Sequence, residues 1–219
     1  MRQRKAKDLD NRLAQCGHII ISEEELKDCD FICEGQGSLF VEIGCGKGQF
    51  IIKKAIDNPG NRYLGIEGQG TVVLRAAEKA EKAGLEMPIA NLRFANCFVN
   101  GMDKLFEGEL IDTVYLNFSD PWPKDRHAKR RLTYHKRLED YARYIKPGGY
   151  IEIKTDNDKL FEFTLEEIGM VPLLEIVEVT RDLHGEDSRY ESRLTMTEYE
   201  EKFKNLGKNI NYVRVRVNK

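Results

Sequence analysis

The sequence has few of the features that mark membrane, secreted or metal-binding proteins. No apolar run approaches the ~18 residues that a membrane-spanning helix requires, and no signal-peptide-like segment follows the basic start at residues 1–5. We therefore expect a cytoplasmic protein without a membrane partner. The five cysteines are odd in number and irregularly spaced, so we expect no disulfide framework. Cys29 and Cys33 have no second Cys/His pair in sequence, and we predict no metal site.

A strong net charge is also lacking. The 219 residues include 35 Lys and Arg and 37 Asp and Glu, for a formal net charge of −2. This balance excludes a disordered polyelectrolyte and removes the overall basic signal typical of nucleic-acid-binding domains. The length fits one domain. We expect a single domain over residues 1–219, with residues 1–20 as a basic N-terminal arm.

Positive charge is instead concentrated in one segment. Seven of the fourteen residues 124–137 are Lys or Arg, against one acid, Asp125. Residues 1–12 are also basic, so the rest of the chain is acidic. A basic cluster on an acidic chain indicates a local polyanion-binding surface. The alternative is a solvated helix face, but the cluster lacks the acidic partners at i+4 that such a face commonly carries.

Short apolar runs alternate with helical patterns along the chain. We predict strands at residues 39–43, 63–67, 92–95, 111–118, 150–154, 173–180 and 212–217, helices at 48–57, 71–83, 102–106, 129–144 and 158–168, and a turn at 146–149. This alternation is typical of a parallel sheet with helices on both faces. In the last strand, valines alternate with Tyr and Arg, which is typical of an antiparallel edge. We therefore predict an α/β fold with a doubly wound, mostly parallel seven-stranded sheet and an antiparallel edge strand.

A glycine-rich segment follows the first of these strands. It reads Val41-Glu-Ile-Gly44-Cys-Gly46-Lys-Gly48 and stands between a predicted strand and a predicted helix. Glycines there allow a sharp turn and a close approach of a cofactor to the backbone. Glu67 ends the next strand, where an acid can accept hydrogen bonds from both hydroxyls of a ribose. The pair indicates a cofactor of the adenosine type.

The details of this segment favour S-adenosylmethionine over a dinucleotide. The third glycine comes one position earlier than in G-x-G-x-x-G, and Gln49 stands in its place. Glu42, just before the loop, is a poor neighbour for a pyrophosphate and a good one for an ammonium or a sulfonium. A nicotinamide dinucleotide and a plain strand–helix turn remain the alternatives.

A second distinctive segment follows the fourth predicted strand. Asp120 and Trp122 lie in a loop stiffened by two prolines, at the end of a strand where open α/β sheets hold their ligands. An acid and an aromatic ring next to a methyl donor suit a planar base as the acceptor of the methyl group. The carboxylate can accept hydrogen bonds from the N–H groups of the base, and the ring can stack on it. Trp122 could instead fill the core. The basic cluster that follows is the arrangement expected for a phosphate-backbone substrate.

The segment Asn117-Phe-Ser-Asp-Pro-Trp-Pro-Lys-Asp-Arg-His-Ala-Lys-Arg-Arg-Leu132 resembles the signature of the bacterial tRNA (guanine-N7-)-methyltransferase family. The resemblance continues through residues 153–156 and 196–203 and runs from about Ser38 to the C-terminus. It implies a Rossmann-like enzyme that transfers a methyl group from S-adenosylmethionine to N7 of a guanine in the tRNA variable loop. The products are the methylated tRNA and S-adenosylhomocysteine. The enzyme would be a monomer or a homodimer.

The resemblance also implies roles for individual residues, with Asp120 as the catalytic residue. Those that would bind the cofactor are Glu42, Gly44, Gly46, Glu67, Asn96 and Asp120. Those that would bind the tRNA are Lys124, Arg126, Lys129, Arg130, Arg131, Asp156, Thr197, Glu198, Tyr199 and Glu200. The chain departs from the family's pattern at Asn96, where an acid is common, and at Gly68-Gln69-Gly70.

Other interpretations stay open at this point. Thr197-x-x-Glu200 also matches a helix capping box, and Asp156 could cap the helix that follows it. For the whole chain, the alternatives are a methyltransferase for another acceptor, an RNA-binding protein without turnover and a nicotinamide oxidoreductase.

Overall fold

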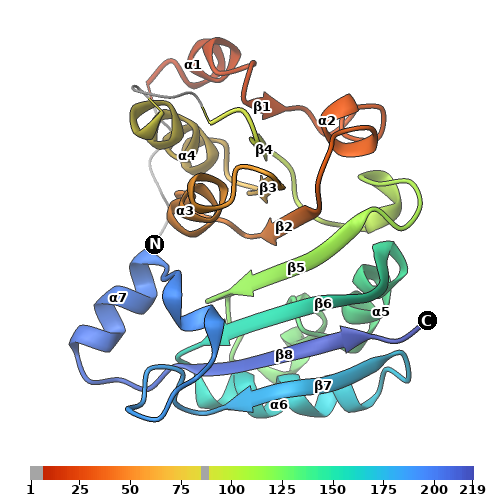
Figure 1. Cartoon of the computed structure of the whole chain (residues 1–219), viewed down its shortest axis with the longest axis vertical. Helices are drawn as coiled ribbons and strands as arrows, with labels where there is room; N and C mark the ends of the chain where they lie inside the picture. Colours follow the sequence, from red (N-terminus) through yellow and green to blue (C-terminus); the bar gives the residue numbers. More distant parts are fainter. Residues whose placement is uncertain (1–6, 85–88) are drawn as a thin grey trace. The chain divides into compact units, whose positions relative to one another are not determined.

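The computed structural model describes residues 7–84 and 89–219, which group into two compact units. The first unit covers residues 1–107 and the second covers residues 108–219. Both consist of strands and helices in alternation, drawn from red to green and from green to blue in Figure 1.

The first unit has four parallel strands in the order β1-β4-β3-β2. They are β1 (Ile20–Ile21), β2 (Leu39–Ile43), β3 (Arg62–Ile66) and β4 (Leu92–Ala95). Its helices are α1 (Leu9–Gln15), α2 (Asp30–Cys33), α3 (Gln49–Asp57), α4 (Gly70–Ala83) and the short 3-10 helix η1 (Met102–Lys104). Because parallel strands run in the same direction, the carboxyl ends of β2, β3 and β4 lie at one edge.

Strand β3 is at the centre of this unit and is buried along its whole length. Burial on both faces is what a parallel strand covered by helices requires. Arg62 begins the strand, and its guanidinium donates hydrogen bonds to the main-chain oxygens of Phe31, Ile32 and Gly37. These bonds compensate for burying the charge and tie the segment around α2 to the sheet.

The start of the chain adds a helix and a strand that the sequence analysis did not predict. Residues 1–6 of the predicted N-terminal arm lie outside the described residues. Beyond them, α1 packs against α4, and Arg12 forms an ion pair with Glu78 of α4. Ile20 and Ile21 then pair with Phe94 and Ala95 of β4, so the described residues contain eight strands rather than seven.

The second unit has four strands in the order β5-β6-β8-β7. They are β5 (Ile111–Asn117), β6 (Ile145–Thr155), β7 (Leu174–Thr180) and β8 (Asn211–Val217). Its helices are α5 (His135–Tyr144), α6 (Asp158–Gly169), α7 (Glu198–Asn205) and the 3-10 helices η2 (Asp125–Arg130) and η3 (Glu191–Leu194). In Figure 1, α5 and α6 lie behind the strands, and α7 lies at the left, beside the ends of β5 and β6.

The predicted α/β class is confirmed, with one correction to the position of the last strand. β5 and β6 are parallel, and β8 is antiparallel to both β6 and β7. β8 therefore lies inside the sheet, and β7 is at the edge. The alternation of β8 reflects one polar face of the sheet and not an unpaired edge: on that face Arg214 pairs with Glu152 and Glu178, and Arg216 pairs with Glu175, all on the neighbouring strands.

The helix predicted at residues 129–144 is split in the structure. Residues 125–130 form η2, and α5 begins only at His135. Tertiary contacts override the helical pattern here. Arg131 turns its side chain toward the loop that precedes it, and the Glu167 carboxylate of α6 accepts a hydrogen bond from the His135 main-chain N–H, which starts α5 at that point.

The turn predicted at residues 146–149 lies within β6. The pairing of β5 with β6 passes from Ile111↔Ile145 directly to Thr113↔Tyr150. The extra residues bulge out of the ladder, with Gly148 at a φ of 77°, a value that glycine adopts without strain. The prolines and glycines thus bend one strand rather than separating two elements.

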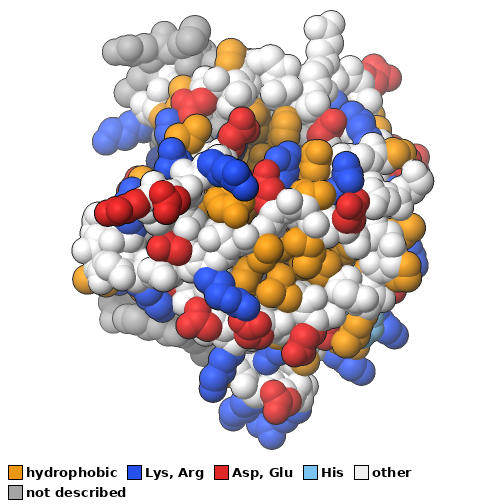
Figure 2. All heavy atoms as spheres, turned by 60° about the horizontal axis from the view of Figure 1, so that its bottom comes forward, with side chains coloured by type: hydrophobic (Ala, Val, Ile, Leu, Met, Phe, Trp, Pro, Cys, Tyr) orange, Lys and Arg blue, Asp and Glu red, His pale blue; other side chains and the backbone are white. Residues whose placement is uncertain are grey.

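Strand β7 exposes several apolar side chains at the edge of the second unit. Ile176, Val177 and Val179 are between 39% and 47% exposed, and Met170 and Leu173 precede them. Figure 2, turned so that the β7 side comes forward, shows hydrophobic side chains gathered among charged ones on this face. Glu175 and Glu178 interrupt the strand with charges, as exposed edges commonly do. A monomer or a homodimer stays a prediction.

No helix in the described part of the chain has the length and apolarity that crossing a bilayer requires. Among the same residues, no group of three or more His, Cys, Asp or Glu side chains is arranged to hold a metal ion.

Candidate active site

The glycine loop between β2 and α3 is an open turn at the carboxyl edge of the first unit. Its main-chain N–H groups at Gly44 and Cys45 donate to the Ile66 oxygen at 2.8 and 3.1 Å, which anchors the turn to β3. Gly44 and Gly46 have φ values of 77° and 56°, in the left-handed region that favours glycine. No atom lies within 4 Å of the position that a Cβ on Gly46 would take. A ligand can therefore approach this backbone closely.

Gly48, at the end of the loop, has a different role. A Cβ there would lie 3.0 Å from the Ala76 Cβ and 3.1 Å from the Phe94 ring. The glycine thus lets α3 begin in close contact with α4 and β4. The loop combines one glycine that leaves space for a ligand with one that packs the helix against its neighbours.

Glu67 joins the loop from the end of β3. Its Oε2 accepts a hydrogen bond from the Gly46 N–H at 3.2 Å, and its Oε1 accepts one from the Gln69 N–H at 2.9 Å. A carboxylate has about four acceptor positions, so Glu67 can also accept hydrogen bonds from a ligand's hydroxyl groups. The loop itself thus holds the Glu67 carboxylate beside the main chain of Gly46.

The loop lies in a negative electrostatic environment. Glu42, the residue before Ile43, is buried in β2 with 2% exposure. Burial raises the pKa of the Cys45 thiol well above its usual value, and the charges of Glu42 and Glu67 raise it further. The same two carboxylates favour a cationic ligand and disfavour a pyrophosphate. Cys45 itself stays a neutral thiol.

Asn96 and the glycines at 68 and 70 lie together beyond β3 and β4. A Cβ added to Gly70 would lie 3.4 Å from the amide nitrogen of Asn96. A Cβ added to Gly68 would lie 2.3 Å from the ring of Phe98. Phe98 is 64% exposed. The unusual Gly68-Gln69-Gly70 segment therefore makes room for an amide and an exposed aromatic ring at the carboxyl edge of the strands.

In the second unit, Asp120 is exposed on the loop that follows β5. Arg131 holds this loop from below: its Nε and a terminal nitrogen donate to the main-chain oxygens of Pro121 and Trp122 at 3.0 and 3.1 Å. Its guanidinium also lies 4.2 Å from the centre of the Phe163 ring. Arg131 is only 9% exposed. This predicted tRNA ligand is thus held by partners inside the protein.

The other predicted cationic ligands are on the surface. Lys124, Arg126, Lys129 and Arg130 are all exposed in or beside η2. The Arg130 guanidinium lies 5.0 Å from the Trp122 ring, and the His127 ring meets the same indole edge-on at 5.8 Å. Trp122 is half-buried, and its main chain has a φ of 39°. The alternative in which it fills the core is wrong, because Trp122 is not fully buried and its ring packs against Arg130 and His127 at the surface.

The predicted capping box at the start of α7 is confirmed. Thr197 accepts a hydrogen bond from the Glu200 N–H at 3.0 Å, and the Glu200 carboxylate accepts one from the Thr197 N–H at 3.2 Å. Glu198 is half-buried, and Tyr199 is 61% exposed. Of the four predicted tRNA ligands in this segment, Thr197 and Glu200 are buried and Tyr199 is exposed to solvent.

Asp156 does not cap the helix that follows it. Asn157 is the N-cap of α6, with its side-chain oxygen accepting from the Leu160 N–H at 2.9 Å. The Asp156 carboxylate instead forms an ion pair with Lys208 at 2.6 Å. The capping alternative is therefore wrong for Asp156, because the chain continues one residue further before the helix begins.

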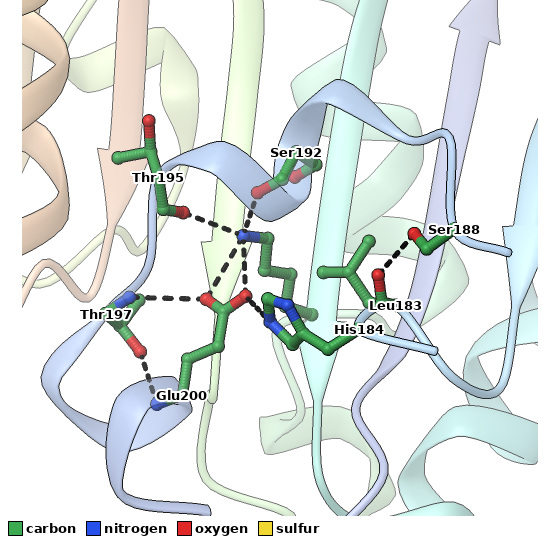
Figure 3. A network of polar contacts seen from close by, with 8 residues as sticks. Leu183, His184, Ser188, Ser192, Thr195, Thr197 and Glu200 are labelled. Atoms are coloured by element: carbon green, nitrogen blue, oxygen red, sulfur yellow. Dashed lines mark hydrogen bonds and ion pairs between the residues drawn. The ribbon is translucent and has the colours of Figure 1, made fainter. Parts of the chain in front are cut away.

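The sequence analysis missed a buried ion pair in this unit (Figure 3). Lys154 of β6 donates to both carboxylate oxygens of Glu200 at 3.1 Å and to the main-chain oxygens of Ser192 and Thr195 at 2.6 and 3.0 Å. The His184 Nε2 lies 2.8 Å from the Glu200 Oε1. Lys154 and Glu200 are 1% and 0% exposed. A lysine in an apolar strand is a signal that a partner exists, but the partner is 46 positions away and only folding brings it close.

Comparison with known proteins decides the class of this chain. A family model described as "Putative methyltransferase" matches residues 36–213. The chain belongs to this methyltransferase family. The match includes both the glycine loop and the Asp120 loop.

Curated relatives of the methyltransferase carry a more specific name. A tRNA (guanine-N(7)-)-methyltransferase of Mycoplasmopsis pulmonis is 42% identical, with 97% of each chain covered. Proteins of the same name from Mesoplasma florum and Bacillus licheniformis are 41% and 40% identical. The alignment with the Mesoplasma florum protein covers 86% of this chain and 85% of that relative. The alignment with the Bacillus licheniformis protein covers 96% of both chains.

Solved structures share the fold of the methyltransferase at low sequence identity. The 16S rRNA methyltransferase KamB has a TM-score of 0.61 at 10% identity, with 100% of this chain and 97% of that chain covered. The aminoglycoside resistance methyltransferase NpmB1 has a TM-score of 0.57 at 15% identity, with 86% and 90% covered. The family and the fold imply S-adenosylmethionine as the cofactor, and the open, acidic glycine loop fits that cation.

Proposed function

We propose that this protein transfers a methyl group from S-adenosylmethionine to N7 of a guanine in the variable loop of tRNA. The observation that carries the proposal is the arrangement after β5, where exposed Asp120 stands on a loop held by Arg131 and leads into the exposed cations of η2. The acid that would recognise the base is followed directly in the chain by the cations that would bind the phosphates. The names of the curated relatives support the same acceptor.

The chemistry requires little from the protein beyond positioning. Guanine N7 has a free lone pair and carries no proton, so its methylation needs no strong general base. S-Adenosylmethionine supplies an electrophilic methyl group when bound. Asp120 would accept hydrogen bonds from the N–H groups of the guanine and stabilise the positive charge that develops on the purine. Orientation of the two reactants accounts for most of the remaining rate enhancement.

The first unit would hold the cofactor. Glu67, held by the N–H groups of Gly46 and Gln69, would accept hydrogen bonds from the ribose hydroxyls, and the open backbone at Gly46 allows close approach. Glu42 would attract the cationic part of the cofactor, and Asn96 would hydrogen-bond its adenine. The amide can serve in place of an acid there, because it both donates and accepts.

The second unit would hold the RNA. Lys124, Arg126, Lys129 and Arg130 are exposed and would contact phosphates, and such contacts weaken as salt concentration rises. Arg131 would act by fixing the Asp120 loop rather than by touching the RNA. We propose that residues 1–219 act as one catalytic domain of a cytoplasmic monomer or homodimer, with each unit contributing its own set of residues.

The deciding experiment measures methyl incorporation from labelled S-adenosylmethionine into an unmodified tRNA transcript. A matched transcript has the variable-loop guanine replaced by adenine. We expect label in the first transcript and none in the second. Equal label in both would keep the enzyme class and overturn the site. No label in either, with the cofactor still bound, would overturn the proposed function.

A further inference from the structure

Three aromatic rings of the second unit form a cluster at the start of α7. The rings of Phe118, Tyr199 and Phe203 lie with their centroids 6.3 to 6.5 Å apart in every pair, and their planes differ by 21 to 26°. Such spacings are within the range for offset-stacked aromatic pairs. The three rings therefore face nearly the same direction.

The cluster is buried at one side and open at the other. Phe118 and Phe203 pack against a core cluster formed by Leu183, Ile210 and Tyr212. Tyr199, in contrast, is 61% exposed. An exposed ring supported by two partly buried rings offers a planar apolar surface to solvent in a fixed orientation.

The chemistry around this surface suits a nucleic acid. The Lys202 Nζ lies 5.8 Å from the Phe203 ring centroid, and the Lys208 Nζ, which also pairs with Asp156, lies 5.0 Å from it. Aromatic rings on which bases stack, flanked by cations that follow the phosphate backbone, are the common design of sites for unpaired nucleotides. Phe118 is two residues from Asp120 in the chain, so one of the two supporting rings lies beside the loop of the proposed catalytic acid.

The buried ion pair fixes the orientation of this surface. The Phe118 N–H donates to the Lys154 main-chain oxygen at 2.8 Å, while the Lys154 ammonium binds Glu200, the neighbour of Tyr199. Lys154 thus links the end of β5 to the first turn of α7. A buried ion pair is costly to form and adds little net stability. We therefore infer that the role of this pair is to position Tyr199 rather than to stabilise the fold.

We propose that Tyr199, supported by Phe118 and Phe203, is a stacking platform for an unpaired base of the RNA substrate, held in place by Lys154 and Glu200. The platform rests on the proposed function, since it presumes that the substrate is a tRNA. It assigns the exposed residue of the Thr197–Glu200 segment to direct contact, and the buried Glu200 to positioning.

The test compares three full-length variants in binding to an unmodified tRNA transcript in the presence of S-adenosylhomocysteine. Tyr199→Leu keeps an apolar side chain without a ring, Tyr199→Phe keeps the ring, and Leu206→Ala removes another exposed apolar side chain next to α7. Base stacking on an aromatic side chain corresponds to about a 5- to 150-fold effect on affinity. We expect Tyr199→Leu to weaken binding at least about fivefold, with the other two variants within about twofold of the parent.

Stacking is also observed directly with a transcript that carries 2-aminopurine at unpaired purine positions of the variable region, one at a time. We expect the fluorescence of 2-aminopurine at one position to be quenched by the parent and by Tyr199→Phe but not by Tyr199→Leu. Equal affinity and equal quenching in all three would overturn the platform. Because neither readout needs methyl transfer, a platform that fails while the enzyme still methylates tRNA is distinguished from failure of the proposed function.

The positioning role has its own test. We expect Glu200→Gln to weaken tRNA binding in the parent and to have no further effect in the Tyr199→Leu background, because the side chain that it positions is then absent. Circular dichroism confirms that each variant is folded. Lys154→Arg, which keeps the charge that pairs with Glu200, should bind tRNA more tightly than Lys154→Met, which removes it. Fully additive effects of Glu200→Gln and Tyr199→Leu would overturn the coupling between them.

Discussion

The ammonium of Lys154 lies 3.1 Å from both carboxylate oxygens of Glu200, and neither side chain is reached by solvent. The pair connects a strand of the sheet to the first turn of α7. The pair also contacts the main-chain oxygens of Ser192 and Thr195, the N–H of Thr197 and the Nε2 of His184. The segment that leads into α7 is therefore built around one buried charge pair.

Removal of one partner of this pair should be strongly destabilising. Lys154→Met leaves the Glu200 carboxylate buried without its cation, which costs about 3–5 kcal/mol in the free energy of unfolding. The double variant Lys154→Met/Glu200→Gln should lose clearly less than the sum of the two single changes, since no uncompensated charge remains. Urea denaturation of the four proteins measures both quantities. Additive losses would contradict the coupling.

Asp120 should affect the rate rather than cofactor binding. Asp120→Asn removes the negative charge that stabilises the developing purine cation, and we expect kcat to fall about 100-fold or more. The Kd for S-adenosylmethionine, measured by calorimetry, should change less than about twofold. Asp125→Asn, at an exposed acid in the same segment, is the matched control. Equal losses in kcat and cofactor affinity would instead assign Asp120 to cofactor binding.

Neighbouring arginines should differ in their effects on salt dependence. Arg130 is exposed, so Arg130→Gln should reduce the slope of log K for tRNA binding against log salt by about 1, as expected when one phosphate contact is lost. Arg131 is buried and bonded to the Pro121 and Trp122 oxygens. Arg131→Gln should lower the melting temperature and leave the slope unchanged. The opposite pattern would reverse the two roles.

Gly68 should be a sensitive position for cofactor binding. A Cβ there would stand 2.3 Å from the Phe98 ring; because that ring is 64% exposed, it can move aside at small cost. We expect Gly68→Ala to weaken S-adenosylmethionine binding while changing the free energy of unfolding by less than about 1 kcal/mol. Gly169→Ala, at the end of α6 with open space around it, is the control for a glycine replacement. Unchanged cofactor affinity would separate this segment from the site.

Cys97 should react slowly with alkylating reagents at neutral pH. Burial raises the pKa of its thiol to about 12, so the reactive thiolate is scarce in the folded protein. Between pH 7 and pH 9 its alkylation by iodoacetamide should rise about tenfold per pH unit without levelling off, because the pH stays below that pKa. In urea the alkylation rate of the same thiol should level off above its ordinary pKa of about 8.5. Peptide mass spectrometry after timed labelling measures both, and a plateau below pH 9 in the folded protein would contradict the shift.

The sequence alone determined the elements with strong local signals. The strand at 39–43, the end of the helix at residue 83 and the capping box at Thr197 were predicted at their observed positions, because each depends on residues a few positions apart. The glycine loop, Glu67 and the Asp120 segment were found in the same way. Their spacing follows from the geometry of a strand, a tight turn and a helix.

Only the tertiary structure decided which of the candidate residues are buried. Arg130 and Arg131 are adjacent in the sequence and chemically identical, yet one is exposed and the other supports the Asp120 loop. Lys154 and Glu200 form one ion pair across 46 positions, and β8 lies inside the sheet although its pattern predicted an edge. Burial depends on which distant segments meet, and the free energy of that packing is not encoded in any local pattern.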